Sequence, residues 1–267
     1  MNRTMRLTLS AAFVVGLSFI ATAAYAQSPF DGTWKLNAAQ SKFDPKPFTV
    51  YTSGGWWHCV SCTPPFDVAA DGQDHAVTGQ PTFDTANATI VDAKTEKLVL
   101  KKGGKLSLEQ TAAVSADGKT LTLTNTGYPP NGGDPTHETD ILKRVGVLPA
   151  GVHATSGNWQ AVKFTGSDNE LLFTFKSDGD QFSMTDPTGD SYTAKFDGND
   201  YPYKGSNGTD AVTLKKIDAH TIVETDKLAG KVVNVSKMTV SANGKSITIE
   251  AHDPQRDTTS TFVATKK

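Results

Sequence analysis

The chain has 267 residues, of which 26 are basic and 28 acidic, and 37% of its residues are hydrophobic. This nearly balanced, slightly acidic composition lacks the clustered positive charge that binds nucleic acid or an anionic lipid surface, so neither partner is expected. The length suits one large or two small domains, each able to bury a core.

The first 26 residues predict a secretory signal peptide. Arg3 and Arg6 precede an uncharged apolar stretch at residues 7–23, and residues 24–26 (AYA) form a small-x-small cleavage site. An uncleaved membrane anchor is the alternative for this stretch. Cleavage removes the two arginines and leaves 24 basic and 28 acidic residues, a net charge of −4. We therefore expect a protein exported to the bacterial periplasm or secreted, without membrane insertion after cleavage.

The rest of the sequence contains an internal duplication. The segment VSADGKTLTL (residues 114–123) returns as VSANGKSITI (residues 240–249), and DGQDHAVTG (residues 71–79) returns at the same spacing as DGNDYPYKG (residues 197–205). Self-similarity at one fixed spacing is the mark of a repeated structural unit. The sequence predicts two tandem domains, 27–150 and 151–267, that meet near a connection bearing glycine and proline.

Each copy shows the pattern of antiparallel strands. Residues 120–124 and 246–250 alternate polar and apolar side chains, which is typical of half-buried strands. Asp117-Gly118 and Asn243-Gly244 predict two-residue hairpins with type I′ turns. No long stretch has a helical period. We expect an all-β protein made of two tandem antiparallel up-and-down β-barrels with eight to ten strands each.

One strand of each copy indicates how polar the two barrel interiors are. In the second copy its alternate positions include Asn234, Ser236 and Met238, whereas the first copy has Leu108 and Gln110 near the matching places. If this face points inward, the second barrel has the more polar interior.

A Gly-x-Trp motif supports the same fold through a family resemblance. It occurs in FDGTWKLNAAQSKF (residues 30–43) and again as Gly157-x-Trp159. Together with the duplicated segments, it resembles bacterial exported lipocalin-like (calycin) proteins. The resemblance implies a barrel with an inner cavity, closed at one end by a basic side chain that crosses the tryptophan. It assigns Arg144 to Trp34, and Lys266 to Trp159.

The two cysteines, Cys59 and Cys62, are expected to form a disulfide, because an exported compartment is oxidising. A thioredoxin-type redox centre needs a helix after the first cysteine, and Pro64-Pro65 prevents one. A metal site with His58 as a third ligand is the remaining alternative. Apart from this alternative, no metal and no cofactor are expected.

Aromatic side chains are the candidate ligand-binding residues. Trp56 and Trp57 are adjacent, so on a strand they face opposite ways, and one can stack on a flat or sugar-like ligand. Tyr201 and Tyr203 share one strand face in the second copy. Ordinary packing is the alternative for all four residues.

The sequence carries few signs of catalysis. The chain contains none of the common catalytic motifs, and Glu224 is the one candidate general base, should it point inward with a pKa raised by burial. We expect a carrier-type protein without catalysis that binds a small, uncharged or weakly polar molecule, with no arginine free to clamp a carboxylate. The alternatives are a calycin-type lyase, hydratase or isomerase, and a non-catalytic envelope interaction module with filled barrels.

Overall fold

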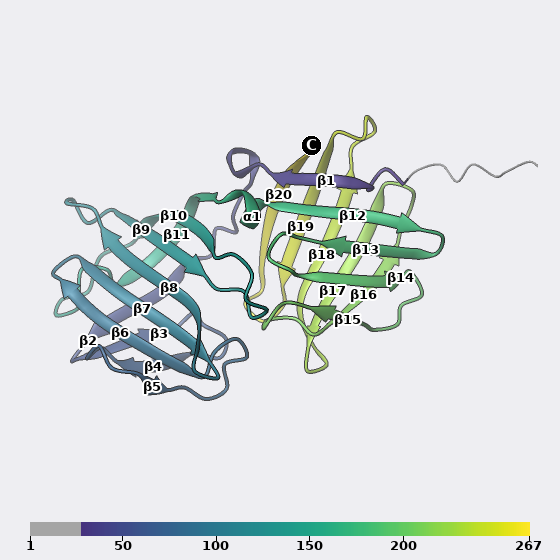
Figure 1. The fold of residues 1–267 in the computed structure, drawn as a ribbon. Helices are drawn as coiled ribbons and strands as arrows, with labels where there is room; N and C mark the ends of the chain where they lie inside the picture. The colour runs from purple at the N-terminus through teal and green to yellow at the C-terminus, as the bar shows by residue number, and fades with distance from the viewer. Residues whose placement is uncertain (1–27) are drawn as a thin grey trace, which may run out of the picture.

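The structure, a computed structural model, describes residues 28–267, so the predicted signal peptide lies outside the described residues. These residues form two ten-stranded antiparallel sheets that lie beside each other as separate barrels (Figure 1). The predicted all-β fold class is therefore confirmed, and the arrangement is consistent with a calycin-like fold. Helix is confined to the 3-10 turn Ala38–Gln40 and the four-residue α1 (Asp168–Leu171) within the described chain.

The N-terminal barrel contains ten consecutive strands. They are β2 (Phe48–Ser53), β3 (Trp56–Cys59), β4 (Phe66–Ala69), β5 (His75–Ala76), β6 (Thr85–Asp92), β7 (Thr95–Lys102), β8 (Lys105–Val114), β9 (Thr120–Gly127), β10 (Thr136–Val145) and β11 (Gly157–Gly166). The sheet begins at β4 and ends at β5. β4 and β5 are the two edges of this sheet and do not pair with each other. A single bridge from Asp71, just after β4, to Thr89 of β6 connects the two sides, so this barrel is nearly closed.

The C-terminal barrel is fully closed, and it takes its first strand from the N-terminal end of the chain. Its strands are β1 (Gly32–Leu36), β12 (Leu172–Asp178), β13 (Gln181–Thr185), β14 (Ser191–Lys195), β15 (Tyr201–Lys204), β16 (Ala211–Lys216), β17 (Thr221–Leu228), β18 (Lys231–Val240), β19 (Ser246–Asp253) and β20 (Thr258–Lys266). β1 closes the barrel because it pairs with β12 on one side and β20 on the other.

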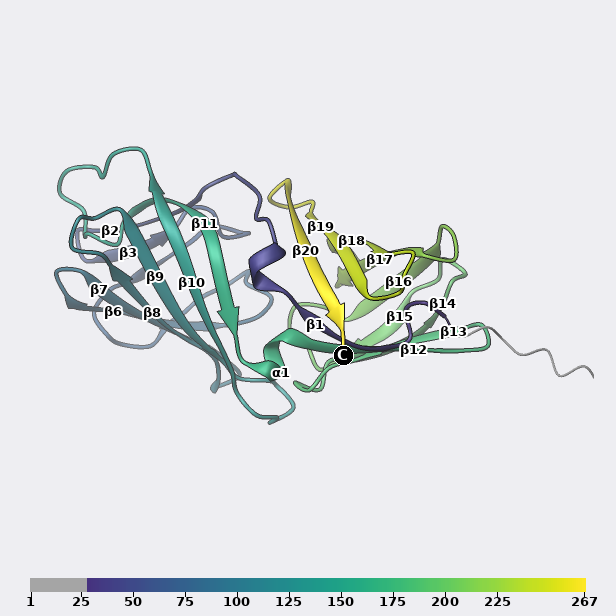
Figure 2. The same ribbon diagram turned by 90° about the horizontal axis from the view of Figure 1, so that it is seen from above.

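The two copies therefore exchange their first strands, which corrects the predicted domain boundary. β1 belongs to the first copy but completes the second barrel, while β11 opens the second copy but pairs with β10 and β2 of the first barrel. The N-terminal barrel is the continuous segment 48–166. The chain crosses between the barrels at residues 37–47 and at α1, whereas the connection near residue 150 is a return within one barrel (Figure 2).

The β10–β11 connection makes buried polar contacts with the N-terminal barrel. His153 Nδ1 lies 3.1 Å from Glu96 Oε1, and Thr155 donates a hydrogen bond of 2.6 Å to the other oxygen of the same carboxylate. The backbone N–H of Thr52 donates to Ser156 Oγ at 2.8 Å. These contacts hold the connection against the N-terminal barrel, so β11 turns back beside β10 and occupies the place that β1 would otherwise fill.

The predicted hairpins are present, but their turn type differs. Gly118 and Gly244 have φ values of 73° and 68°, whereas Asp117 and Asn243 are not among the residues with positive φ. A type I′ turn needs positive φ at both central positions, so the type I′ prediction is wrong here. The side chain of Asp117 instead accepts a hydrogen bond from the backbone N–H of Lys119, which favours a longer turn that ends on a left-handed glycine.

Both Gly-x-Trp motifs place a buried tryptophan beneath a basic side chain. Trp34 and Trp159 are fully buried. Arg144 lies 4.0 Å above the Trp159 ring, and Lys266 lies 5.0 Å from the centre of the Trp34 ring. The predicted pairing, Arg144 with Trp34 and Lys266 with Trp159, is therefore wrong. Each tryptophan lies on a strand that belongs to the other copy's barrel, so Trp34 meets Lys266 and Trp159 meets Arg144.

The glycine of the motif makes room for the basic side chain. Gly157 has a φ of 135°, and a Cβ added there would lie 2.5 Å from a guanidinium nitrogen of Arg144. Gly32 has the same relation to Lys266, with a separation of 2.8 Å from Cε. The motif thus requires glycine for two reasons, backbone conformation and close approach of the cation.

The two basic caps differ in strength. Arg144 donates hydrogen bonds to the carbonyls of Gly118 at 2.6 Å and Ala154 at 2.7 Å, and also to that of Ser156. Lys266 has one long hydrogen bond, of 3.4 Å, to Pro29 O. We expect Arg144→Ala to lower the free energy of unfolding of the N-terminal barrel by about 3 kcal/mol, since three carbonyls and a ring face lose their partner.

Lys266→Ala is the matched control, with an expected loss of about 1 kcal/mol or less in the C-terminal barrel. Urea unfolding followed by tryptophan fluorescence, with hydrogen exchange to assign each transition to a barrel, measures both values. Equal losses in the two variants would show that the hydrogen bonds of Arg144 contribute nothing beyond its position over the ring.

Candidate functional site

The C-terminal barrel contains an interior cavity of about 310 Å³. It lies at the end of the barrel that faces α1, opposite the end capped by Lys266. Its walls are mainly apolar and include Leu36, Phe173, Phe175, Met184, Met238 and Phe262. A concave, apolar space with a few polar groups is the usual form of a small-molecule site.

Two polar groups project into this cavity from neighbouring strands. Glu224 of β17 and Ser236 of β18 are register partners, and both line the cavity. Their inward orientation follows from the alternation of each strand, as do the inward positions of Asp226 and Asn234, which are also register partners. The polar positions of β18 therefore point inward, and the prediction that this barrel has the more polar interior of the two stays a prediction.

A hydrogen-bond network lies behind the Glu224 carboxyl. The Tyr192 hydroxyl of β14 donates to Glu224 Oε2. The Asn234 amide donates to Asp226 Oδ2 at 3.0 Å and to Ser236 Oγ at 2.9 Å. Asp226 Oδ1 is buried and has no hydrogen-bond partner other than the Glu224 carboxyl. The carboxyl groups of Glu224 and Asp226 therefore lie side by side, poorly exposed to water. No basic side chain takes part in this hydrogen-bond network.

Burial governs the ionisation of this network. Loss of solvent, together with the neighbouring Asp226, raises the pKa of Glu224 to about 8, and burial also raises the pKa of Asp226. Burial and the Glu224 carboxyl raise the pKa of Tyr192 well above its usual value. At neutral pH the Glu224 carboxyl therefore keeps its proton and can donate as well as accept a hydrogen bond.

The mouth of the cavity is acidic and opens toward the N-terminal barrel. Glu170 of α1 and Asp186, which follows β13, line both the cavity and a groove of about 370 Å³ between the barrels. Asp190 also lines the groove, and burial raises its pKa to about 6. Tyr128 and Thr82 form the opposite wall of the groove.

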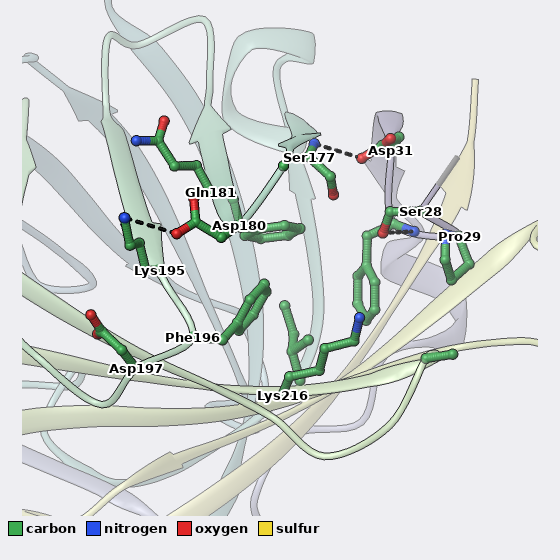
Figure 3. Close-up of a pocket in the computed structure, with 15 residues that line it drawn as sticks. Ser28, Pro29, Asp31, Ser177, Asp180, Gln181, Lys195, Phe196, Asp197 and Lys216 are labelled. Atoms are coloured by element: carbon green, nitrogen blue, oxygen red, sulfur yellow. Dashed lines mark hydrogen bonds and ion pairs between the residues drawn. The ribbon is translucent and has the colours of Figure 1, made fainter. Parts of the chain in front are cut away.

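A larger hollow of about 980 Å³ lies at the other end of the same barrel (Figure 3). Its floor is aromatic, with Phe182 and Phe196, and its rim carries the exposed ion pair of Lys195 and Asp180, 2.8 Å apart. Phe175 of the inner cavity packs against Phe30 and Phe182 of this hollow, with ring centres 6.3 Å and 5.0 Å away. These rings separate the two spaces.

The N-terminal barrel has a second pair of acids, which is half-buried. Glu138 and Asp140 lie on β10, and the Asn125 amide donates to Asp140 at 3.1 Å. Burial and the neighbouring carboxylates of Asp140 and Glu170 raise the pKa of Glu138 to about 7. This barrel also packs Trp57, Phe66 and other apolar side chains around its axis.

The predicted aromatic residues do not come together. Trp56 is 50% exposed on the outer face of β3, whereas Trp57 is buried inside the N-terminal barrel, so they do face opposite ways. Tyr201 and Tyr203 are half-buried in the other barrel, where their hydroxyls donate to Asp197 and Asp190. None of the four lines the inner cavity. Their predicted role in ligand binding stays a prediction.

Cys59 and Cys62 form the predicted disulfide, with an S–S distance of 1.97 Å. The bond leaves neither sulfur as a thiolate ligand, so the metal alternative with His58 is not supported. His58 instead pairs with Asp67 at 2.6 Å and stacks on Tyr51 with ring centres 4.5 Å apart. Among residues 28–267, no group of three or more potential metal-ligating side chains is arranged to hold an ion.

Sequence reasoning identified Glu224 but missed most of its surroundings. Asp226, two residues along the same strand, could have been found because the period of two places it on the same face as Glu224. Tyr192 could not, because its contact with Glu224 depends on the curvature that brings β14 across the barrel from β17. The catalytic role proposed for Glu224 stays a prediction.

No protein-family model matches the chain, and no curated protein or solved structure is significantly similar to it. In the part of the chain that the structure describes, helices are too short and too polar to span a bilayer. The function must therefore be argued from the site.

Proposed function

We propose that this protein is an exported calycin-type binding protein and that its C-terminal barrel holds a small, mainly apolar molecule in the inner cavity. The observation that carries the proposal is a closed barrel with a cavity of about 310 Å³ that has mainly apolar walls, with Glu224 and Ser236 in the wall and Glu170 and Asp186 at the mouth. Ligand sites typically combine such walls with a few oriented polar groups.

The charges of the cavity restrict the ligand further. Glu170 and Asp186 at the mouth are acids and no lysine, arginine or histidine lines the cavity, so an anionic ligand would be repelled and would find no cation to pair with. This supports the expectation that the ligand does not carry a carboxylate. The disulfide between Cys59 and Cys62 is compatible with an oxidising compartment and supports export.

A variant that fills the cavity tests the proposal. Ala251 of β19 lines the cavity, and Ala251→Phe would place a ring inside it. We expect the wild-type protein to bind the neutral apolar dye N-phenylnaphthylamine with a rise in dye fluorescence, and A251F to lose at least tenfold in affinity. Ala161→Ser, in the N-terminal barrel, is the control and should bind as the wild type does.

Equal dye binding by A251F and the wild type would contradict the assignment of this cavity. Recovery of the periplasmic fraction, followed by mass spectrometry, tests the export part of the proposal. A mature chain that begins at Gln27 and contains the intact disulfide is expected.

An acid–base enzyme is the second candidate, and one observation favours it. Glu224 combines a pKa of about 8 with a hydrogen bond from Tyr192 at the wall of a cavity, which suits proton transfer to or from a bound molecule. Mass spectrometry of a ligand recovered from the protein distinguishes the two functions. A binding protein returns the ligand unchanged, whereas an isomerase, lyase or hydratase returns a product.

A further inference from the structure

The path into the C-terminal barrel from its α1 end is lined by acidic residues and by no basic side chain. The inter-barrel groove exposes Asp186 and Asp190, its junction with the cavity has Glu170, and the cavity wall has Glu224. None of the described residues that line the groove or the cavity is lysine, arginine or histidine. A cleft with charge of one sign and apolar walls concentrates solutes of the opposite charge.

Within the cavity, these acids are combined with aromatic walls. Phe173, Phe175 and Phe262 contribute rings to the lining. Ring faces attract an ammonium group and also pack against an apolar body. A bare metal ion does not fit such walls, because hard cations require six or more oxygen ligands. The combination of carboxyl groups with phenyl rings matches an organic cation.

The wall of the cavity can accept the hydrogen bonds of an ammonium group. Tyr192 donates to one oxygen of Glu224, Oε2, and Ser236, its register partner on the neighbouring strand, also lines the cavity. Behind them lies Asp226, whose hydrogen bond with the Glu224 carboxyl contributes to the raised pKa of Glu224 and whose Oδ1 has no other donor. An ammonium group at Glu224 would supply the positive charge that this network lacks.

We propose that the cavity selects a small organic amine with an apolar body, bound as its ammonium ion against Glu224. This inference rests on the proposed binding function and specifies the ligand class of the same site.

Binding of such a cation is linked to a proton. Near neutral pH the Glu224 carboxyl is protonated, so binding of R–NH3⁺ releases the carboxyl proton to solvent and leaves an ammonium–carboxylate pair. The groups that face Glu224 are Asp226 on its own strand, Tyr192 on β14, Tyr203 on β15, Asn234 and Ser236 on β18, and Glu170 and Asp186 at the mouth. None of them is a lysine, arginine or histidine. Affinity for the amine should therefore rise with pH up to about 8.

Three matched probes test the ligand class: phenethylamine, phenethyl alcohol and phenylacetate, with the hexyl series as a second framework. Isothermal titration at pH 6, 7 and 8 measures the affinities. We expect the amine to bind at least tenfold more tightly than the alcohol at pH 8, to weaken toward pH 6 and to release protons on binding. The carboxylate should not bind.

Glu224→Gln keeps the size of the side chain and removes its charge. We expect E224Q to bind the amine no better than the alcohol, without pH dependence. Glu250→Gln is the control, since Glu250 is exposed on β19, where it pairs with Lys237 at 3.3 Å. Unchanged amine preference in E224Q would overturn the inference.

The outcomes separate the two proposals. If the alcohol binds as tightly as the amine in both frameworks, the amine inference fails while the binding function stands. The amine inference also fails, and the binding function again stands, if the neutral dye binds but neither amine does. If neither the dye nor any probe binds, the proposed function fails and the inference fails with it.

Discussion

Replacing Trp34 with alanine is expected to unfold the C-terminal barrel and to leave the N-terminal barrel folded, although Trp34 lies in the first copy of the duplicated sequence. The side chain is fully buried in the core of the C-terminal barrel, and its indole N–H donates to Phe30 O at 2.7 Å. Loss of a buried tryptophan typically costs about 3–5 kcal/mol, roughly the whole stability of a small domain.

Trp159→Ala is the matched variant. Trp159 is equally buried, donates to Thr155 O at 2.8 Å and packs with Leu121 and Leu142 of the N-terminal barrel. We therefore expect the reverse result, with the N-terminal barrel unfolded and the C-terminal barrel retained. Hydrogen exchange followed by mass spectrometry separates peptides of the two barrels and reports which barrel opens in each variant.

This pair of variants tests the strand exchange itself. Without the exchange, Trp34 would belong to the N-terminal barrel, and the two results would be interchanged. Deletion of residues 28–36 should have a larger effect than W34A, because it also removes Phe30 and leaves β12 and β20 as unpaired edges.

The free energy of unfolding is expected to fall as the pH rises from about 5 to about 9. Folding raises the pKa of Glu224 to about 8, of Glu138 to about 7 and of Asp190 to about 6, and it also raises the pKa of Asp140 and Asp226. In each case the main cause is burial of the carboxyl group away from water.

Stability falls with rising pH because the folded and unfolded states bind different numbers of protons. Between the unfolded pKa near 4 and the raised folded pKa, the folded protein binds more protons than the unfolded chain, so a rise in pH favours unfolding. The stability is fully present below the unfolded pKa and is lost as the pH rises through the folded pKa. For Glu224 alone the loss is on the order of 4 kcal/mol.

Exposed aspartates act in the opposite sense at lower pH. Backbone and side-chain hydrogen bonds lower the pKa of Asp44 and Asp117, so their contribution appears above about pH 4 and is lost in acid. Together the two sets predict a stability maximum near pH 5.

Urea unfolding at several pH values measures this profile. In E224Q the side chain is neutral at every pH, so the decline between about pH 5 and 8 should be clearly shallower than in the wild type. E250Q, an exposed control, should retain the wild-type slope. A wild-type stability that stays level or increases from pH 5 to pH 9 would contradict burial of these carboxyl groups.

The sequence predicted much of the architecture because those features depend on short-range chemistry. Alternation over residues 120–124 and 246–250 identified strands, and the Asp-Gly and Asn-Gly pairs identified hairpins. The predicted signal peptide, which implies an oxidising compartment, led to the predicted disulfide between Cys59 and Cys62. Glu224 was named as a candidate general base on the condition that it pointed inward, and the structure places it at the cavity wall.

The remaining parts of the site depend on the tertiary structure. Glu224 receives its hydrogen bond from Tyr192, 32 residues earlier, and the acidic mouth combines α1 with the segment after β13. The aromatic residues that looked most suitable for ligand binding, Trp56 and Tyr201, lie on different barrels, and neither lines the inner cavity. Spacing along a chain does not show which strands meet across a barrel.

The amino-acid sequence by itself determined that two β-sheets form, that each contains a glycine–tryptophan strand beneath a basic side chain, and that one loop is cross-linked. Only the tertiary structure decided which tryptophan strand joins which barrel. The physical reason is that duplicated barrels present similar edges, so β1 and β11 carry the same motif and either could pair at either site. The buried contacts of His153, Glu96 and Ser156 hold β11 beside β10, and β1 then completes the barrel that remains open.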